Sequence, residues 1–187
     1  MDLYHVALFG HIMGAVVVVG SGFVFPVILG GVARANSVAA FRNWGDAVLK
    51  ISQAAGVAAA VVMISGLYMA ITADFFPQAW VVVSLVLFVV NGVLAGGVLS
   101  KHWKGVMEQA EAAGDGPVPE QLRAAAFAPR TQVIESLTLA NDIAIVFLMT
   151  NKPGLTGTLV AMFAGFALAG ALVARGARQH SGSAVAA

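Results

Sequence analysis

Two ionisable side chains, His11 and Asp142, interrupt stretches that are otherwise apolar. His11 is nine positions from Leu3 and Asp142 is nine positions from Thr150, counting both ends. A helix rises about 1.5 Å per residue, so both side chains sit roughly 12 Å inside their helices. We expect them at matching depth and predict a His11–Asp142 hydrogen bond, which would fix the imidazole tautomer and satisfy the carboxylate.

Such a pair has two interpretations that the sequence leaves open. Ionisable residues in lipid are costly and usually face the interior of a helix bundle, which favours a functional role. The pair would then relay protons or supply a ligand to haem or copper. Alternatively, it is a polar clamp between two helices, which contributes about 1 kcal/mol.

Three further polar residues complete the predicted intramembrane centre. Ser65 is expected in the same half of the membrane as His11, and Asn91 lies nearer the middle. Glu135 precedes Asp142 by seven residues, so the two carboxylates share one face of a helix. Glu135 can reach water at its nearby helix end, and a proton path from Glu135 to Asp142 is the alternative.

A cofactor site at His11 is the second hypothesis. Imidazole and thioether groups suit Cu(I), so His11 and Met13 are the candidate metal ligands, and His11 alone is the candidate ligand for haem b. Methionine also fills apolar packing, which is the alternative for Met13. The chain has no cysteine, so disulfides, thiolate metal sites and cysteine nucleophiles are excluded.

Composition places these residues in a membrane protein. The 187 residues are 59% hydrophobic and 10% charged, against about 45–50% and about 25% in soluble domains. A chain so poor in charge cannot cover itself with a water-compatible surface. The net charge of +1 gives no basic bias for nucleic acid.

The charges bound four uncharged apolar segments that are long enough to cross a bilayer, and residues 132–150 form a fifth apolar stretch. We predict an all-α polytopic bundle, a single domain over residues 1–178, with five spans at residues 3–31, 51–73, 79–100, 132–150 and 155–174. Glu135 and Asp142 interrupt the 132–150 span, which leaves an interfacial helix as its alternative. Residues 101–130 form a helical loop, with helices over 101–113 and 120–128, and residues 179–187 form a disordered tail.

The basic residues predict the orientation of the bundle. With five crossings, nine of the ten Lys and Arg residues fall on one side and only Lys152 on the other. Because basic loops stay in the cytoplasm, the amino terminus should be outside and the carboxyl terminus and the 101–130 loop cytoplasmic. We expect a multi-pass protein of the bacterial inner membrane.

Small residues predict where helices approach closely. Gly10 and Gly14 are four residues apart, as are Gly92 and Gly96, and both pairs fit a helix-packing motif. A run of Gly and Ala in the last span indicates tight packing within the bundle or against another subunit. Besides the lipid bilayer, we therefore expect further copies of the chain (a homo-oligomer) or other membrane subunits as partners.

Short motifs at both ends of this core resemble a known family. They are Asp2-Leu3-Tyr4, His11-Ile12-Met13-Gly14-Ala15 and Gly20-Ser21-Gly22 in the first span, and Met149-Thr150-Asn151-Lys152-Pro153 at the close. They resemble bacterial predicted integral membrane proteins of unknown function over about residues 1–153. That family is similar, more remotely, to copper-resistance protein D and to HemJ-type protoporphyrinogen oxidases, and this resemblance implies that His11 corresponds to their membrane histidine.

The combined prediction is an integral membrane component with a buried His/Asp centre and no enzymatic activity. The alternative is a membrane protein that handles haem or copper in redox chemistry or transport. The family resemblance implies no established activity, and the sequence names no substrate.

Overall fold

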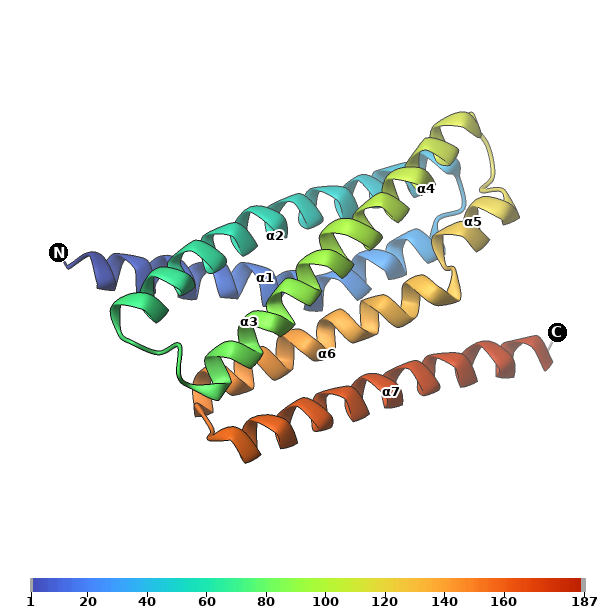
Figure 1. The fold of residues 1–187 in the computed structure, drawn as a ribbon. Helices are drawn as coiled ribbons and strands as arrows, with labels where there is room; N and C mark the ends of the chain where they lie inside the picture. Colours follow the sequence, from blue (N-terminus) through green and yellow to red (C-terminus); the bar gives the residue numbers. More distant parts are fainter. Residues whose placement is uncertain (1, 186–187) are drawn as a thin grey trace.

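The protein is entirely helical in the computed structural model, which describes the backbone of residues 2–185 and the side chains of residues 2–168, 170 and 171. One π-helix interrupts the third long helical segment. The elements are α1 (Leu3–Arg34), α2 (Val38–Thr72), α3 (Ala79–Asn91), η1 (Gly92–Leu99), α4 (Ser100–Ala112), α5 (Glu120–Ala126), α6 (Pro129–Asn151) and α7 (Leu155–Val185). Successive long helices run antiparallel, and α7 lies beside α6 at one edge of the bundle (Figure 1).

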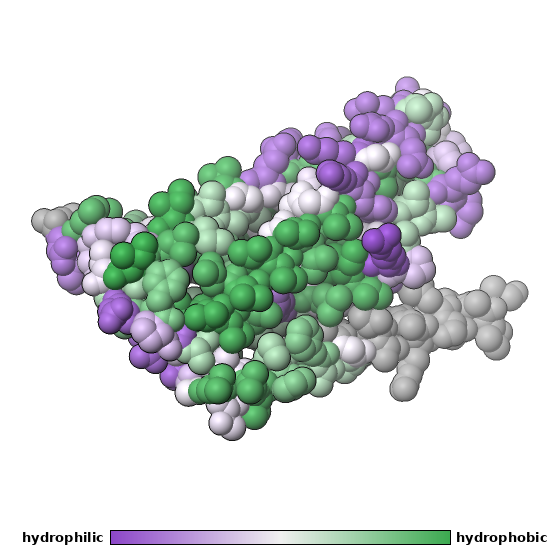
Figure 2. Space-filling model, in the orientation of Figure 1, coloured by the Kyte–Doolittle hydropathy of each residue, from purple (hydrophilic) through white to green (hydrophobic). Residues whose placement is uncertain are grey.

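Four helical stretches among the described residues are long and apolar enough to cross a membrane: Leu3–Arg34, Val38–Thr72, Ala79–Ala112 and Glu120–Asn151. α7 adds a shorter apolar stretch, Leu155–Leu168. Large hydrophobic side chains cover the outside of the bundle, including Phe9, Val27 and Ile64, which are 67%, 68% and 71% exposed. Figure 2 shows this hydrophobic band, with hydrophilic residues concentrated toward the ends of the molecule. Such a surface is compatible with lipid and not with water.

The helices extend beyond the apolar segments that the sequence delimits. α2 begins at Val38 rather than near residue 51, because the Ser37 hydroxyl accepts a hydrogen bond from Ala40 N at 3.2 Å and caps the helix. α4 and α5 occupy the two places in the 101–130 segment where short helices are expected. α7 is helical to Val185, into the predicted tail, and the last two residues lie outside the described part of the chain.

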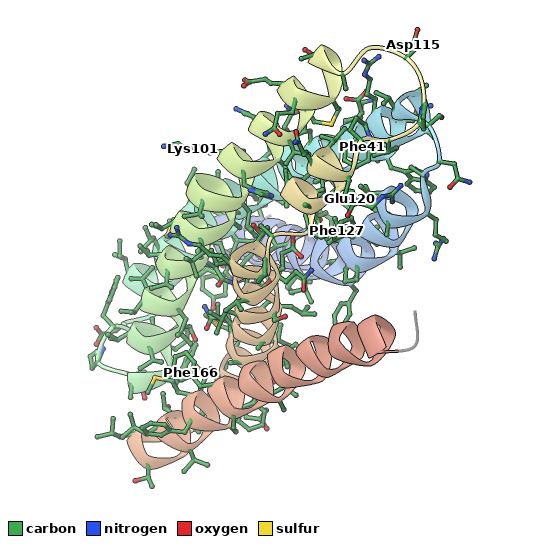
Figure 3. The ribbon with its side chains drawn as sticks, turned by 90° about the vertical axis from the view of Figure 1, so that its right-hand side faces the viewer. Phe41, Lys101, Asp115, Glu120, Phe127 and Phe166 are labelled. Atoms are coloured by element: carbon green, nitrogen blue, oxygen red, sulfur yellow. The ribbon has the colours of Figure 1, made fainter. Side chains whose placement is uncertain are left out.

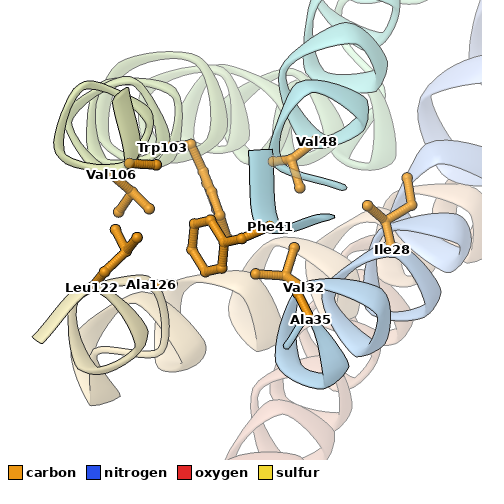
Figure 4. Close-up of a cluster of buried hydrophobic side chains, with 10 residues drawn as sticks. Ile28, Val32, Ala35, Phe41, Val48, Trp103, Val106, Leu122 and Ala126 are labelled. Carbon is orange, nitrogen blue, oxygen red and sulfur yellow. The ribbon is translucent and has the colours of Figure 1, made fainter. Parts of the chain in front are cut away.

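The two ends of the bundle differ in how tightly they are packed. We call the end formed by the α1–α2 turn, α4 and α5 the basic end. There Phe41, Trp103 and Val106 are at most 2% exposed and form a core with residues of α1 and α5 (Figure 4). In Figure 3, Phe41 lies inside this end, whereas Lys101 projects away from it and Asp115 sits at the tip of the α4–α5 loop.

Two arginines hold the basic end together by capping helices. Arg42 donates to Ala110 O at 2.8 and 3.0 Å and to Gly114 O at 3.0 Å, at the carboxyl end of α4. Arg123 on α5 donates to Ala35 O at 2.9 Å, just after α1 ends. A cation near terminal helix carbonyls satisfies them and interacts favourably with the helix dipole. The basic end is therefore a rigid base from which the long helices extend.

The two predicted glycine motifs have different outcomes. A Cβ at Gly14 would lie 2.8 Å from Val62 Cγ2 and 3.0 Å from Ala58 O, so only glycine allows α1 and α2 to approach so closely. At Gly92 and Gly96 a Cβ would meet nothing within 4 Å in the part of the chain that the structure describes. The first motif packs helices. The second lies in the π-helix, where no neighbouring helix requires it.

The expected contact of the last helix is present. A Cβ added at Gly165 on α7 would lie 3.2 Å from the Ala144 side chain on α6. The turn before α7 is fixed by the Thr158 hydroxyl, which donates to Pro153 O at 3.2 Å. α6 and α7, which correspond to the predicted fourth and fifth spans, are thus antiparallel neighbours (Figure 1).

Candidate functional site

A cavity of about 710 Å³ lies at the end of the bundle opposite the basic end, between the α1–α2 pair and the α3–α6 pair. We call this the Lys152 end, after the residue that closes α6 there. The walls are overwhelmingly apolar, and the polar side chains that line the cavity are Tyr4, His11, Ser84, Asp142, Thr150 and Lys152. Ligand cavities commonly measure about 300–1,000 Å³ and combine apolar walls with a few polar groups. This cavity has the size and lining of a site for a small molecule.

His11 is held in a defined orientation on the cavity wall. Its Nδ1 lies 3.0 Å from Val62 O on α2 and 3.4 Å from the Ser65 hydroxyl. A carbonyl oxygen only accepts, so Nδ1 carries the proton and, in the neutral ring, Nε2 carries a lone pair. Gly66 makes this possible, because a Cβ there would lie 2.9 Å from His11 Cε1.

Asp142 belongs to a separate hydrogen-bond network between α3 and α6. Asn91 Nδ2 donates to Asp142 Oδ1 at 2.7 Å and to Thr138 O at 3.1 Å. Asn141 Nδ2 donates to Asn91 Oδ1 at 2.8 Å and to Leu87 O at 3.0 Å. Asn91 is 8% exposed, so its amide is fully used in a buried network. The second Asp142 oxygen, Oδ2, is on the side of α1, where a Cβ on Gly22 would lie 3.7 Å from it.

The predicted hydrogen bond between His11 and Asp142 is therefore wrong. Each side chain has its own partners, Val62 and Ser65 for His11 and Asn91 for Asp142. Both line the same cavity from different walls. Their helices place both side chains at one cavity, but the pairing of each depended on which helix packs beside it.

Glu135 lies toward the basic end of α6, away from the lining of the cavity. Its carboxylate is next to the indole of Trp103 on α4. Trp103 Nε1 is buried and has no hydrogen-bond partner among the described residues. The five residues of the predicted centre thus divide into three places: His11 with Ser65, Asn91 with Asp142, and Glu135 near Trp103.

The metal ligands predicted in the first helix do not converge. Met13 is 47% exposed and does not line the cavity, because residues two apart on a helix point in nearly opposite directions. Among the described residues, no cluster of three or more His, Asp or Glu side chains could hold a metal ion. His11 Nε2 would be the one protein ligand for a haem iron, whereas a copper site with several donors does not fit the described side chains.

Ser84 is a lining residue that lies outside the predicted centre. It is 1% exposed, and its hydroxyl has no hydrogen-bond partner among the described residues. Helical serines usually donate to a carbonyl of the preceding turn, as Ser65 does to Val61 O. Ser84 therefore keeps an unpartnered hydroxyl buried in the cavity wall. In the sequence it is one serine in a run of valines and leucines.

Lys152 also lines the cavity and lies outside the predicted centre. It has φ 46° and ψ 51°, the left-handed conformation that ends α6. Its ammonium lies 5.6 Å from the centroid of the Trp80 ring and 5.8 Å from that of Phe75. Both rings also line the cavity. The turn sequence predicts a helix end here, but the aromatic partners are distant in sequence: Phe75 lies in the α2–α3 connection and Trp80 at the start of α3.

Comparison with known families agrees with these features. The family model described as "Predicted integral membrane protein (DUF2269)" matches residues 5–153. The chain belongs to this family. No curated protein and no solved structure gives a significant match. The DUF2269 match spans α1 to α6 and ends just beyond Lys152, so it contains every helix that lines the cavity.

Proposed function

We propose that this DUF2269 protein binds a lipid-soluble molecule in the cavity between the α1–α2 and α3–α6 pairs, as a membrane component without enzymatic activity of its own. The observation that carries the proposal is the cavity itself. It offers about 710 Å³ of apolar space between the helices, partly open to the surroundings, which is room for a small lipid-soluble molecule. His11 and Asp142, which line the cavity, would give that occupant hydrogen-bond partners.

The proposed arrangement has five crossings, with α7 as the fifth. The amino terminus would be outside and the basic end cytoplasmic, in the inner membrane of a bacterium. The support is the concentration of arginines and lysines at the basic end, against Lys152 at the other. A periplasmic reporter that is active when fused to the carboxyl terminus would contradict this orientation.

A cavity-filling variant tests the binding function. Ala15 lines the cavity, so Ala15→Phe should remove much of the space for a ligand. Val17, two residues along, is 40% exposed and does not line the cavity, so Val17→Phe is the matched control. The measurement is native mass spectrometry of the purified protein with its co-purifying lipids. We expect a bound small molecule in the parent and in Val17→Phe but not in Ala15→Phe. A parent protein that carries no ligand and takes up none from a membrane extract would refute the function.

Haem is the second candidate occupant, and one observation favours it. The Nδ1 of His11 donates a hydrogen bond to a backbone carbonyl. Histidines that bind metals commonly make this bond, because it fixes the ring and leaves Nε2 as the ligand atom. Haem b would supply one-electron redox chemistry when bound. A Soret band in the purified protein that is lost in His11→Ala would support haem. A colourless protein that does not acquire the band on addition of haemin would exclude it.

A further inference from the structure

We infer that the ligand of this cavity is an anionic amphiphile whose charged headgroup, a phosphate or a carboxylate, pairs with Lys152 while its hydrocarbon body lies between the four helices. This inference rests on the proposed binding function and names the class of ligand. It is carried by three features of Lys152 that are independent of the cavity volume.

The first feature is the backbone of Lys152. Its left-handed conformation is one that glycine adopts at no cost and that other residues adopt rarely. The same turn contains a glycine, Gly154, but the residue in the left-handed conformation is Lys152. A turn selected for stability alone favours glycine at residue 152. Lysine at this position indicates that the side chain has a role.

The second feature is the charge of Lys152. It makes no ion pair with any described residue. The ion pairs among the described residues, His5–Asp2 and Arg42–Asp115, lie elsewhere. The Trp80 and Phe75 rings attract the ammonium without neutralising it. The cation is therefore held in place at the cavity and is available to an anion.

The third feature is the distribution of charge within the cavity. Among the described residues that line the cavity, only Lys152 and Asp142 carry a full charge when His11 is neutral. They are ten residues apart on one helix, so about 15 Å separates them along its axis. An anion at Lys152 is far from the carboxylate of Asp142. The space between them is lined by apolar side chains of all four helices, including Leu85, Phe88, Ile145 and Met149, and suits a hydrocarbon chain.

Quenching of Trp80 by chain-brominated amphiphiles tests the inference. Trp80 lines the cavity, whereas Trp103 lies in the core of the basic end and Trp44 beside Gly31, so a chain in the cavity quenches Trp80 selectively. The protein is kept in dodecyl maltoside, whose headgroup is neutral. Brominated dodecanoate and dodecyl phosphate are the anionic probes, and brominated dodecanol is the neutral probe. Trp80→Phe identifies the part of the signal that reports on the cavity.

We expect both anionic probes, or one of them, to bind about tenfold more tightly than dodecanol, the ratio that corresponds to one charged hydrogen bond. Tighter binding of the phosphate indicates a phospholipid-like headgroup, and tighter binding of the carboxylate indicates a fatty acid. Lys152→Met should abolish the preference and Lys152→Arg should keep it. Lys101→Met, which removes a lysine at the other end of the bundle, should behave like the parent.

Lys152→Gly keeps the test valid if Lys152→Met folds poorly. Glycine relieves the left-handed backbone, so this variant should have a higher Tm than the parent and still lose the preference for anions. Equal affinity of the parent for dodecanol and for both anions, or a preference that survives Lys152→Gly, would overturn the inference and leave the proposed function intact. Absence of Trp80 quenching by all three probes would overturn the proposed function as well.

Discussion

Asn91 on α3 donates a hydrogen bond of 2.7 Å to the carboxylate of Asp142 on α6. Since Asn141 in turn donates to the Asn91 oxygen at 2.8 Å, the Asn91 amide is the centre of the contact between these helices. It also directly precedes the π-helix η1, an element that often marks functional positions in helices. The network fixes one wall of the cavity.

Removal of Asn91 should weaken the bundle measurably. Asn91→Leu leaves Asp142 Oδ1 and one Asn141 N–H without partners, so we expect a loss of about 1–2 kcal/mol of unfolding free energy. Asn151→Leu is the control, because the hydrogen bonds of Asn151 are exposed at the end of the same helix α6. Unfolding in a graded denaturing detergent gives both values. Equal effects of the two substitutions would contradict a structural role for the Asn91 network.

His11 and Asp142 should be energetically independent, since they share no hydrogen bond. In a double-mutant cycle of His11→Ala and Asp142→Ala, we expect the two losses of stability to add within about 0.5 kcal/mol. Asn91→Leu combined with Asp142→Ala should be non-additive by roughly 0.6 to 1.7 kcal/mol, the range measured for hydrogen bonds within membranes. Coupling of the first pair as strong as that of the second would restore the direct contact expected from the sequence.

Gly14 should tolerate no larger residue. The Cβ of Gly14→Ala would meet Val62 Cγ2 at 2.8 Å and the Ala58 carbonyl oxygen at 3.0 Å, and backbone cannot easily move away. We expect a loss of about 1–3 kcal/mol from overpacking between α1 and α2. Gly20→Ala on the same helix meets nothing within 4 Å and should be neutral or stabilising. Thermal unfolding monitored by circular dichroism compares the two variants, and similar midpoints would contradict the close approach of these helices.

The glycines of η1 should respond in the opposite way to Gly14. A Cβ at Gly92, Gly96 or Gly97 has open space, so packing does not require glycine at these positions. The triple substitution to alanine should raise Tm, because each glycine in a helix costs about 1 kcal/mol relative to alanine. We also expect this variant to take up the Trp80 quencher more slowly, because alanine stiffens η1 and so restricts bending of the cavity wall that α3 forms. A lowered Tm would show that the π-helix itself needs glycine.

Arg42 should be necessary for the basic end to fold. Arg42→Met removes hydrogen bonds to three carbonyl groups, those of Ala110, Glu111 and Gly114, and we expect a loss of about 1.5–3 kcal/mol. Arg130→Met, which alters an exposed arginine at the same end, should change stability by less than about 0.5 kcal/mol. Hydrogen exchange of α4 would localise the effect, and protection unchanged from the parent would argue against the capping role.

Much of the fold follows from one-dimensional properties of the chain. The apolar segments and the charges between them predict the helices, and Ser37 and Pro129 mark helix starts that lie outside those segments. Depth along each helix also placed His11 and Asp142 in a common region, because the rise per residue is constant. The Gly10–Gly14 spacing predicts the close approach at Gly14, but the same spacing at Gly92 and Gly96 meets no neighbouring helix, so packing decided between the two motifs.

The partners of the polar residues depended on how the helices pack in three dimensions. His11 bonds to a backbone carbonyl on α2 that no sequence pattern marks, and it can do so because Gly66 lacks a side chain. Asp142 bonds to Asn91 because α3 and α6 are in contact at that position, whereas His11 lines a different wall of the cavity. Lys152 meets Trp80 and Phe75 only once the α2–α3 and α6–α7 turns lie at the same end of the bundle. The sequence determined that this is a helical membrane protein with rare buried polar groups, and packing between distant helices decided which of those groups face the cavity.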